Sequence, residues 1–187
     1  MATLRTIAIA VFVLWLLIDG VVVFRRASPT AENRDRWSLR VLAFGNLLAW
    51  MVAITLAFSR YGAIHPAVPV QAAGLALMGI GILVRSTAIA QLGRFHMPNV
   101  AVLPDHDVMQ RGLYRHIRHP SYLGALIAFL GFGLALGNWL GTVVLVVLSL
   151  AVYLFRIHEE EAALTAVLGE QYSEYARRTK RLIPGVY

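Results

Sequence analysis

Five apolar segments dominate this chain and restrict it to a membrane-spanning fold. They lie at residues 4–24, 41–59, 70–91, 121–137 and 139–157. The first three can each cross a bilayer as a helix, since about 20 apolar residues cover a hydrocarbon core of about 30 Å. The last two are shorter and are separated only by Gly137-Asn138-Trp139, which is typical of a short helical hairpin. The sequence therefore predicts an all-α, polytopic integral membrane protein with about five transmembrane helices.

The composition agrees with this class and excludes several functions. Of the 187 residues, 58 % are hydrophobic and 14 % are charged, whereas soluble domains carry about 25 % charged residues. The chain has no cysteine, which excludes thiol catalysis, disulfides and thiolate metal sites within it. Its net charge of +7 favours membrane lipids over nucleic acid, because the arginines gather between the apolar segments. We expect one domain over residues 1–187, no nucleic-acid partner and no obligate protein partner.

The Lys and Arg residues predict the orientation in the membrane. With five helices, 14 of the 17 Lys and Arg residues fall on one side, in loops 25–40 and 92–120 and in the tail from residue 156. The positive-inside bias places this side in the cytoplasm and the N-terminus outside. The first apolar segment is long for a signal peptide and is followed by Arg25-Arg26, so we interpret it as a transmembrane helix.

Two further patterns predict how the helices are arranged. Small residues on both arms of the hairpin indicate close packing of its backbones; they are Gly124, Gly131, Gly133 and Gly141. Residues 159–180 then combine apolar and charged positions at helical spacing. This pattern predicts a C-terminal amphipathic helix on the cytoplasmic membrane face, with an interruption at Gly169.

One polar cluster lies where the fourth apolar segment begins, in the stretch from Arg115 to Tyr122. Pro120 lacks a backbone donor, so it predicts a helix start with His119 near the cap. Tyr122 then falls in the first helical turn, where the positive end of the helix dipole favours an anionic group. A simple membrane anchor, with arginines on lipid phosphates and a tyrosine at the interface, is the alternative interpretation.

A second polar cluster lies at the end of the fifth apolar segment. Arg156 and Glu160 are four residues apart and share a helix face, whereas Glu161 points about 100° away. Either Arg156 and Glu160 form an intrahelical pair, or the carboxylate meets a cationic ligand and the arginine an anionic one. The five-helix arrangement places both clusters on the same side of the membrane.

Two charged residues lie inside apolar segments, and the histidines raise the question of a metal. Asp19 and Arg85 are costly in a membrane, and we interpret each as a snorkelling side chain or a member of a structural ion pair. Histidines such as His116 and His119 lack the tight helical pairs of membrane di-metal enzymes, so no metal site is predicted.

Several motifs together resemble the isoprenylcysteine carboxyl methyltransferase family, to which the phospholipid N-methyltransferases are related. The motifs are Gly112-Leu-Tyr-Arg-His-Ile-Arg-His-Pro-Ser-Tyr122, Arg156-x-x-x-Glu160-Glu161, Leu168-Gly-Glu-Gln-Tyr-Ser-Glu-Tyr175 and Arg181-Leu-Ile-Pro184. The resemblance covers the chain from about residue 70 onward. It implies that residues 70–187 form the cofactor-binding and catalytic part, whereas residues 1–69 supply two further helices.

The resemblance implies methyl transfer from S-adenosyl-L-methionine, with S-adenosyl-L-homocysteine as product, at the cytoplasmic membrane face. The acceptor would be a lipophilic small molecule or lipidated substrate that enters from the bilayer. Arg156 matches a residue that faces the substrate, and Glu160 matches a cofactor-binding carboxylate. The other positions that match cofactor contacts are His106, Asp107, Val108, Met109, Tyr114, His119, Pro120, Ser121 and Tyr122.

The chemistry of the acceptor separates the candidate functions. Arg156 favours an anionic acceptor, which suggests O-methylation of a prenylcysteine-like carboxylate, and an ionised carboxylate needs no base. N-methylation of a lipid amine is an alternative that would require a base, for which Glu160 and His119 are the candidates. A membrane NADPH-dependent reductase and a non-enzymatic membrane scaffold are the two alternatives from other classes.

Overall fold

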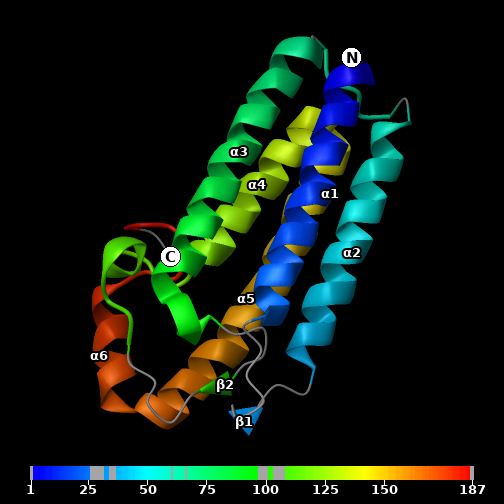
Figure 1. Ribbon diagram of the computed structural model, residues 1–187. Helices are drawn as coiled ribbons and strands as arrows, with labels where there is room; N and C mark the ends of the chain where they lie inside the picture. The colour runs from blue at the N-terminus through cyan, green and yellow to red at the C-terminus, as the bar shows by residue number, and fades with distance from the viewer. Residues whose placement is uncertain are drawn as a thin grey trace.

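Helices dominate the architecture (Figure 1). The computed structural model describes residues 2–25, 32–33, 37–59, 61–65, 67–96, 101–102 and 108–185. The elements are α1 Ala2–Arg25, β1 Glu32–Asn33, α2 Ser38–Ala57, α3 Ala67–Leu92, η1 Gly93–Phe95, β2 Ala101–Val102, η2 Gly112–Arg115, α4 Pro120–Leu136, α5 Trp139–Leu168 and α6 Glu170–Arg178. β1 and β2 form a two-residue antiparallel pair. The predicted all-α class is confirmed.

The long helices confirm the polytopic membrane architecture. Four helices are long and apolar enough to cross a membrane: α1 through its Thr3–Val22 part, α2, α3 and α5. The fifth apolar helix, α4, has 17 residues, which corresponds to about 25 Å at 1.5 Å per residue. The first four apolar helices begin and end within three residues of the predicted segments.

The predicted end of the last apolar helix at residue 157 is wrong. α5 is a single helix of 30 residues and ends only before Gly169, whose φ is 52°. Arg and Glu are good helix formers, and no Gly or Pro occurs between residues 142 and 168, so the change in polarity does not break the helix. The predicted amphipathic helix over 159–180 is therefore divided at Gly169 into the end of α5 and the short α6.

α3 and α4 lie side by side with their backbones in close contact (Figure 1). A Cβ atom added to Gly124 would lie 2.5 Å from the backbone nitrogen of Arg85, and one added to Gly74 would lie 2.5 Å from that of Ala135. Gly131 approaches the α3 backbone in the same way. The assignment of Gly124 and Gly131 to packing within the α4–α5 hairpin is therefore wrong.

The other two hairpin glycines serve two different contacts. Gly133 does face α5, where an added Cβ would lie 2.7 Å from the Thr142 hydroxyl. Gly141 instead faces α2, with an added Cβ 3.0 Å from the Ala53 carbonyl oxygen. The sequence identified the small residues correctly but could not assign each to its neighbouring helix.

α1 and α2 complete the bundle through aromatic and close backbone contacts. Phe12 of α1 stacks on Phe132 of α4 with 3.9 Å between ring centroids, and it meets Trp50 of α2 edge-on at 5.5 Å. An added Cβ at Gly45 of α2 would lie 2.5 Å from the Val152 side chain of α5. α2 is therefore seated firmly on α5, the helix that carries the second polar cluster.

Asp19 and Arg85 form an ion pair with each other inside the bundle. The Arg85 Nε atom donates to Asp19 Oδ1 at 2.8 Å and the Nη2 atom to Oδ2 at 2.7 Å. Their side chains are only 11 % and 18 % exposed. Of the two sequence-based interpretations, the structural ion pair is confirmed, and it joins α1 to α3 beside the first turn of α4.

The apolar face of α6 is covered by the protein itself. Tyr172 and Tyr175 are buried against Val108, with Leu164 and Leu168 of α5 packed beside them. The apolar face that predicted contact with the membrane surface thus serves tertiary packing. α6 consequently lies next to the loop that precedes α4.

Candidate active site

The first polar cluster forms the start of α4, as its proline predicted. His119 is the N-cap residue, and Pro120 occupies the first turn, where its missing N–H is not needed. The backbone nitrogen atoms of Tyr122 and Leu123 both donate to the His119 carbonyl, at 3.2 and 3.1 Å. The ring of Tyr122 stacks between His119, at a centroid distance of 5.6 Å, and Tyr153 of α5, at 4.9 Å.

The segment that follows α6 holds the residues before α4 in place. The backbone nitrogen of Arg118 donates to the Lys180 carbonyl at 2.7 Å, and that of His119 donates to the Arg181 carbonyl at 3.0 Å. Ile117 and Lys180 form a parallel β-bridge, and Leu182 is buried. The C-terminal segment therefore acts as a short strand that fixes the backbone around His119.

Glu161 is the centre of an ion-pair cluster that joins α5 to these two segments. Its Oε1 atom accepts from Arg118 Nε at 2.8 Å and lies 3.2 Å from His119 Nε2. Its Oε2 atom accepts from Arg181 Nε at 2.9 Å. The Glu161 side chain is 13 % exposed, so these cations offset the cost of burying its charge. The sequence predicted no role for Glu161.

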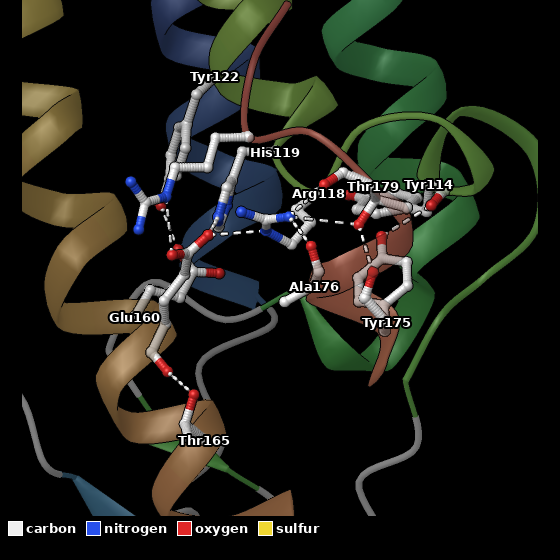
Figure 2. A network of polar contacts seen from close by, with 11 residues as sticks. Tyr114, Arg118, His119, Tyr122, Glu160, Thr165, Tyr175, Ala176 and Thr179 are labelled. Atoms are coloured by element: carbon white, nitrogen blue, oxygen red, sulfur yellow. Dashed lines mark hydrogen bonds and ion pairs between the residues drawn. The ribbon is translucent and has the colours of Figure 1, made fainter. Parts of the chain in front are cut away.

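Arg118 and Tyr175 also join α6 and the residues that follow it to the loop (Figure 2). The Nη1 atom of Arg118 donates to the carbonyl oxygens of Ala176, at 2.8 Å, and Thr179, at 2.5 Å. The Tyr175 hydroxyl donates to the Tyr114 carbonyl at 2.7 Å. Burial raises the pKa of Tyr175 to about 12, so this hydroxyl stays protonated and remains a donor at neutral pH.

Glu160 faces α4, in contrast to its neighbour Glu161. Its Oε2 atom accepts a hydrogen bond of 2.7 Å from the Tyr122 hydroxyl, which Figure 2 shows between the two helices. The two polar clusters that the sequence placed on one side of the membrane are therefore in direct contact. Glu161 builds the scaffold of the site, and Glu160 is held in it by a hydrogen bond from Tyr122.

Arg156 lies one helical turn before Glu160 and is deeply buried. Its guanidinium donates through Nη1 to the hydroxyl of Ser38, the first residue of α2, and only 2 % of the residue is exposed. The side chain of Arg156 also forms a hydrogen bond with the Tyr122 hydroxyl. A cation and a carboxylate thus converge on Tyr122 from the same face of α5. Ser38 was missed by the sequence analysis, because a serine at the start of an apolar segment is unremarkable.

The other predicted site residues lie around this centre, with two exceptions. Tyr114 is buried, and its hydroxyl donates to the Ala88 carbonyl at 3.3 Å. Pro120 and Ser121 are buried in the first turn of α4, and Val108 packs on α6 next to the partly buried Met109. His106 and Asp107 lie outside the described residues.

The chemistry of these groups fits a small ligand that carries both signs of charge. Glu160 can offset a cationic ligand group, and the α4 start with His119 favours an anionic one. The Tyr172 hydroxyl, buried beside Val108, makes no hydrogen bond to any part of the protein that the structure describes. A zwitterionic cofactor with a cationic centre matches this set of groups.

Comparisons with known proteins agree with the motif resemblance. The profile of the isoprenylcysteine carboxyl methyltransferase (ICMT) family matches residues 74–166. A Schizosaccharomyces pombe protein-S-isoprenylcysteine O-methyltransferase is 33 % identical over 61 % of this chain and 49 % of its own length. The B form from Arabidopsis thaliana is 34 % identical over 60 % of this chain and 58 % of its own length. The chain thus spans about half the length of these curated relatives.

Two further similarities extend over more of the chain. A probable protein-S-isoprenylcysteine O-methyltransferase of Oryza sativa subsp. indica is 26 % identical over 91 % of this chain and 95 % of its own length. The solved structure of a eukaryotic intramembrane Ras methyltransferase ICMT superposes with a TM-score of 0.58 and 26 % identity. This likeness covers 77 % of the present chain and 52 % of that one. Residues 74–166, which include Tyr114, His119, Tyr122, Arg156 and Glu160, match the model of the ICMT family.

Proposed function

We propose that this protein transfers a methyl group from S-adenosyl-L-methionine to a lipophilic acceptor, most specifically to a prenylcysteine-like carboxylate. The observation that carries the proposal is the meeting of Glu160, Tyr122 and Arg156 where the apolar bundle joins the loop before α4. The names of the relatives add that such proteins act as protein-S-isoprenylcysteine O-methyltransferases. S-adenosyl-L-methionine, when bound, supplies an electrophilic methyl group on a positively charged sulfur.

The residues of the α4 start and of α5 have distinct roles in this proposal. Glu160 offsets the positive charge of the cofactor, and its bond to Tyr122 holds the carboxylate in one orientation. His119, Pro120, Ser121 and Tyr122 form the helix start that receives the anionic group. Val108, Met109 and Tyr114 line the same side. His106 and Asp107, which lie outside the described residues, are assigned to the cofactor by the motif resemblance alone. Methyl transfer is an in-line displacement, so orientation and exclusion of water account for most of the acceleration.

Arg156 orients the acceptor. Its buried guanidinium, held by Ser38, binds a carboxylate of the acceptor and turns one oxygen toward the methyl group. A carboxylate is already ionised at neutral pH, so no protein group has to accept a proton. The lipid part of the acceptor lies in the bilayer between the apolar helices. α1 and α2, within residues 1–69, therefore belong to the same functional unit as residues 70–187.

N-methylation of a lipid amine is the second candidate, because one contact in the site favours it. His119 Nε2 lies 3.2 Å from the carboxylate of Glu161, a contact that fixes the orientation of the ring. A histidine held in this way can remove a proton from an amine during transfer. A screen with carboxylate and amine acceptors and a labelled methyl donor separates the two reactions.

The active site is proposed to face the cytoplasm. The loops and tail that carry it hold most of the 17 Lys and Arg residues of the chain, and these residues favour the cytoplasmic side. Labelling of single cysteines, introduced at the exposed Arg115 and at the exposed Tyr61 in intact cells, tests this orientation. Only the cysteine at position 61 is expected to react with an impermeant reagent.

Calorimetric titration of the detergent-purified protein with S-adenosyl-L-homocysteine tests the proposal, with NADPH as the comparison. Saturable binding at one site per chain is expected for S-adenosyl-L-homocysteine, and none for NADPH. Binding of NADPH alone would favour a reductase. Absence of both, in a sample with a cooperative unfolding transition, would favour a membrane scaffold and overturn the proposal.

Arg156→Ala is expected to impair use of the acceptor without weakening binding of the cofactor. The acceptor loses its anchoring cation, so kcat/KM for a carboxylate acceptor should fall by about 100-fold or more, as expected when a buried charge pair is truncated. Affinity for S-adenosyl-L-homocysteine should remain within about twofold of wild type. Ser38→Ala should lower kcat/KM by about tenfold, the effect of losing one charge-assisted hydrogen bond, and Ser38→Thr should restore it. A loss of cofactor affinity in Arg156→Ala would contradict this assignment.

A further inference from the structure

The Tyr172 hydroxyl is a buried polar group whose hydrogen-bonding capacity is unused. Tyr172 is 5 % exposed, and its hydroxyl has no hydrogen-bond partner in the described parts of the chain. Its neighbour Tyr175 is equally buried, but the hydroxyl of Tyr175 donates to the Tyr114 carbonyl at 2.7 Å. Buried hydroxyls are nearly always satisfied in folded proteins, so an unsatisfied one indicates a partner that binds from outside the chain.

The surroundings of Tyr172 place this hydroxyl at the candidate active site. The ring packs on Val108 and meets Tyr175 edge-on, with 6.1 Å between ring centroids. Burial, followed by the negative charges of Glu161 and Glu160, raises the pKa of the Tyr172 hydroxyl. The group is therefore neutral at physiological pH and lies in the field of the two carboxylates on α5. Val108 and Glu160 are both among the residues proposed to line the cofactor site.

α6 holds Tyr172 rigidly in this position. One helical turn further along, Ala176 accepts a hydrogen bond of 2.8 Å from Arg118, and Tyr175 bonds to the loop at Tyr114. Arg118 in turn binds Glu161 at 2.8 Å. The ring of Tyr172 cannot turn outward without breaking the packing between α6 and Val108, so its hydroxyl is preorganised rather than adaptable.

We propose that Tyr172 is a further cofactor-binding residue, whose hydroxyl hydrogen-bonds to the bound S-adenosyl-L-methionine or S-adenosyl-L-homocysteine. The inference rests on the proposed function, because it requires a cofactor beside Glu160. The nearby carboxylates favour a cationic N–H donor in the ligand, so the hydroxyl accepts from the ammonium group of the cofactor. α6 would then be part of the binding site and not only a cap on the loop.

Tyr172→Phe tests this role because it removes only the hydroxyl. A purely structural tyrosine would give unchanged cofactor affinity. If the hydroxyl binds the ligand, its removal weakens cofactor binding but does not weaken the fold. The dissociation constant for S-adenosyl-L-homocysteine should rise by about tenfold, as expected for the loss of a hydrogen bond to a charged group. The thermal midpoint without ligand should stay the same or rise, because the variant no longer buries an unsatisfied hydroxyl.

Two comparison variants make the result decisive. Tyr61→Phe changes a tyrosine that is 79 % exposed at the other end of the bundle, and it should alter neither the affinity nor the thermal midpoint. Tyr175→Phe removes a satisfied hydroxyl and should lower the thermal midpoint. Calorimetric titration and unfolding of the full-length protein in detergent measure both quantities for each variant.

The possible outcomes are distinct. Weaker cofactor binding in Tyr172→Phe, at an unchanged or higher thermal midpoint, supports the proposal. An affinity within about twofold of wild type overturns it. A lower thermal midpoint also overturns it, because the hydroxyl would then have a partner within the protein. Failure of the wild-type protein to bind S-adenosyl-L-homocysteine overturns the proposed function itself, and this result needs no variant to be recognised.

Discussion

Glu160→Ala is expected to abolish measurable binding of S-adenosyl-L-homocysteine to the purified protein. Glu160 is the carboxylate that Tyr122 orients at 2.7 Å, whereas the ion pairs with Arg118 and Arg181 belong to Glu161. Its removal leaves the cationic part of the cofactor without its counter-charge in a partly buried site. Truncating one member of such a pair costs at least about 2.7 kcal/mol, or 100-fold in affinity. Calorimetric titration under the conditions used for wild type measures the effect.

Glu159→Ala is the matched control for this result. Glu159 belongs to the same run of three carboxylates but is exposed to solvent. Both substitutions remove one negative charge from the same turn of α5, so a general electrostatic effect would be similar in the two variants. We expect the affinity of Glu159→Ala to stay within about twofold of wild type, since exposed charges contribute little. Equal affinity in wild type and Glu160→Ala would refute the role assigned to Glu160.

Glu161→Gln is expected to destabilise the protein more than it changes the chemistry. The substitution preserves the shape of the side chain but removes the charge that Arg118 and Arg181 share. Breaking a buried ion pair by removing one partner costs about 3 kcal/mol or more, because the remaining cations are left without compensation. Denaturant unfolding of the detergent-solubilised protein, followed by circular dichroism, measures the free energy of unfolding.

Glu170→Gln provides the comparison for this second effect. Glu170 pairs with Arg177 at 2.7 Å, but both side chains are largely exposed, at 74 % and 63 %. Exposed pairs contribute about 0.5 kcal/mol, so the variant should unfold almost as wild type does. If the two glutamine variants were equally stable, the Glu161 cluster could not be what holds α5, the loop and the C-terminal segment together.

The Glu161 cluster also explains why one run of carboxylates can serve two purposes. Successive residues of a helix point about 100° apart, so Glu160 and Glu161 contact different neighbours. Glu161 faces the loop and the C-terminal segment and stabilises the scaffold. Glu160 faces Tyr122 and remains the carboxylate for the ligand. Because α5 continues unbroken to Leu168, Glu160 and Glu161 cannot exchange their positions.

Local chemistry allowed part of the site to be predicted from the sequence. Pro120 and His119 define a helix start through their own backbone properties, so the predicted start of this helix was confirmed. Arg156 and Glu160 share a helix face through their spacing alone. The hydrogen bond between Tyr122 and Glu160 was not predicted, because these residues are 38 positions apart. The motif resemblance was confirmed independently over residues 74–166.

The sequence by itself determined the membrane class and the number of apolar helices. These properties depend on hydropathy and on spacing within one segment, both of which neighbouring residues specify. Only the tertiary structure decided which partners meet. Asp19 and Arg85 are separated by 66 positions, and Arg118 and Glu161 by 43. Such pairs form because glycines let α3 approach α4 and because α6 packs back on the loop, and no local pattern encodes that choice.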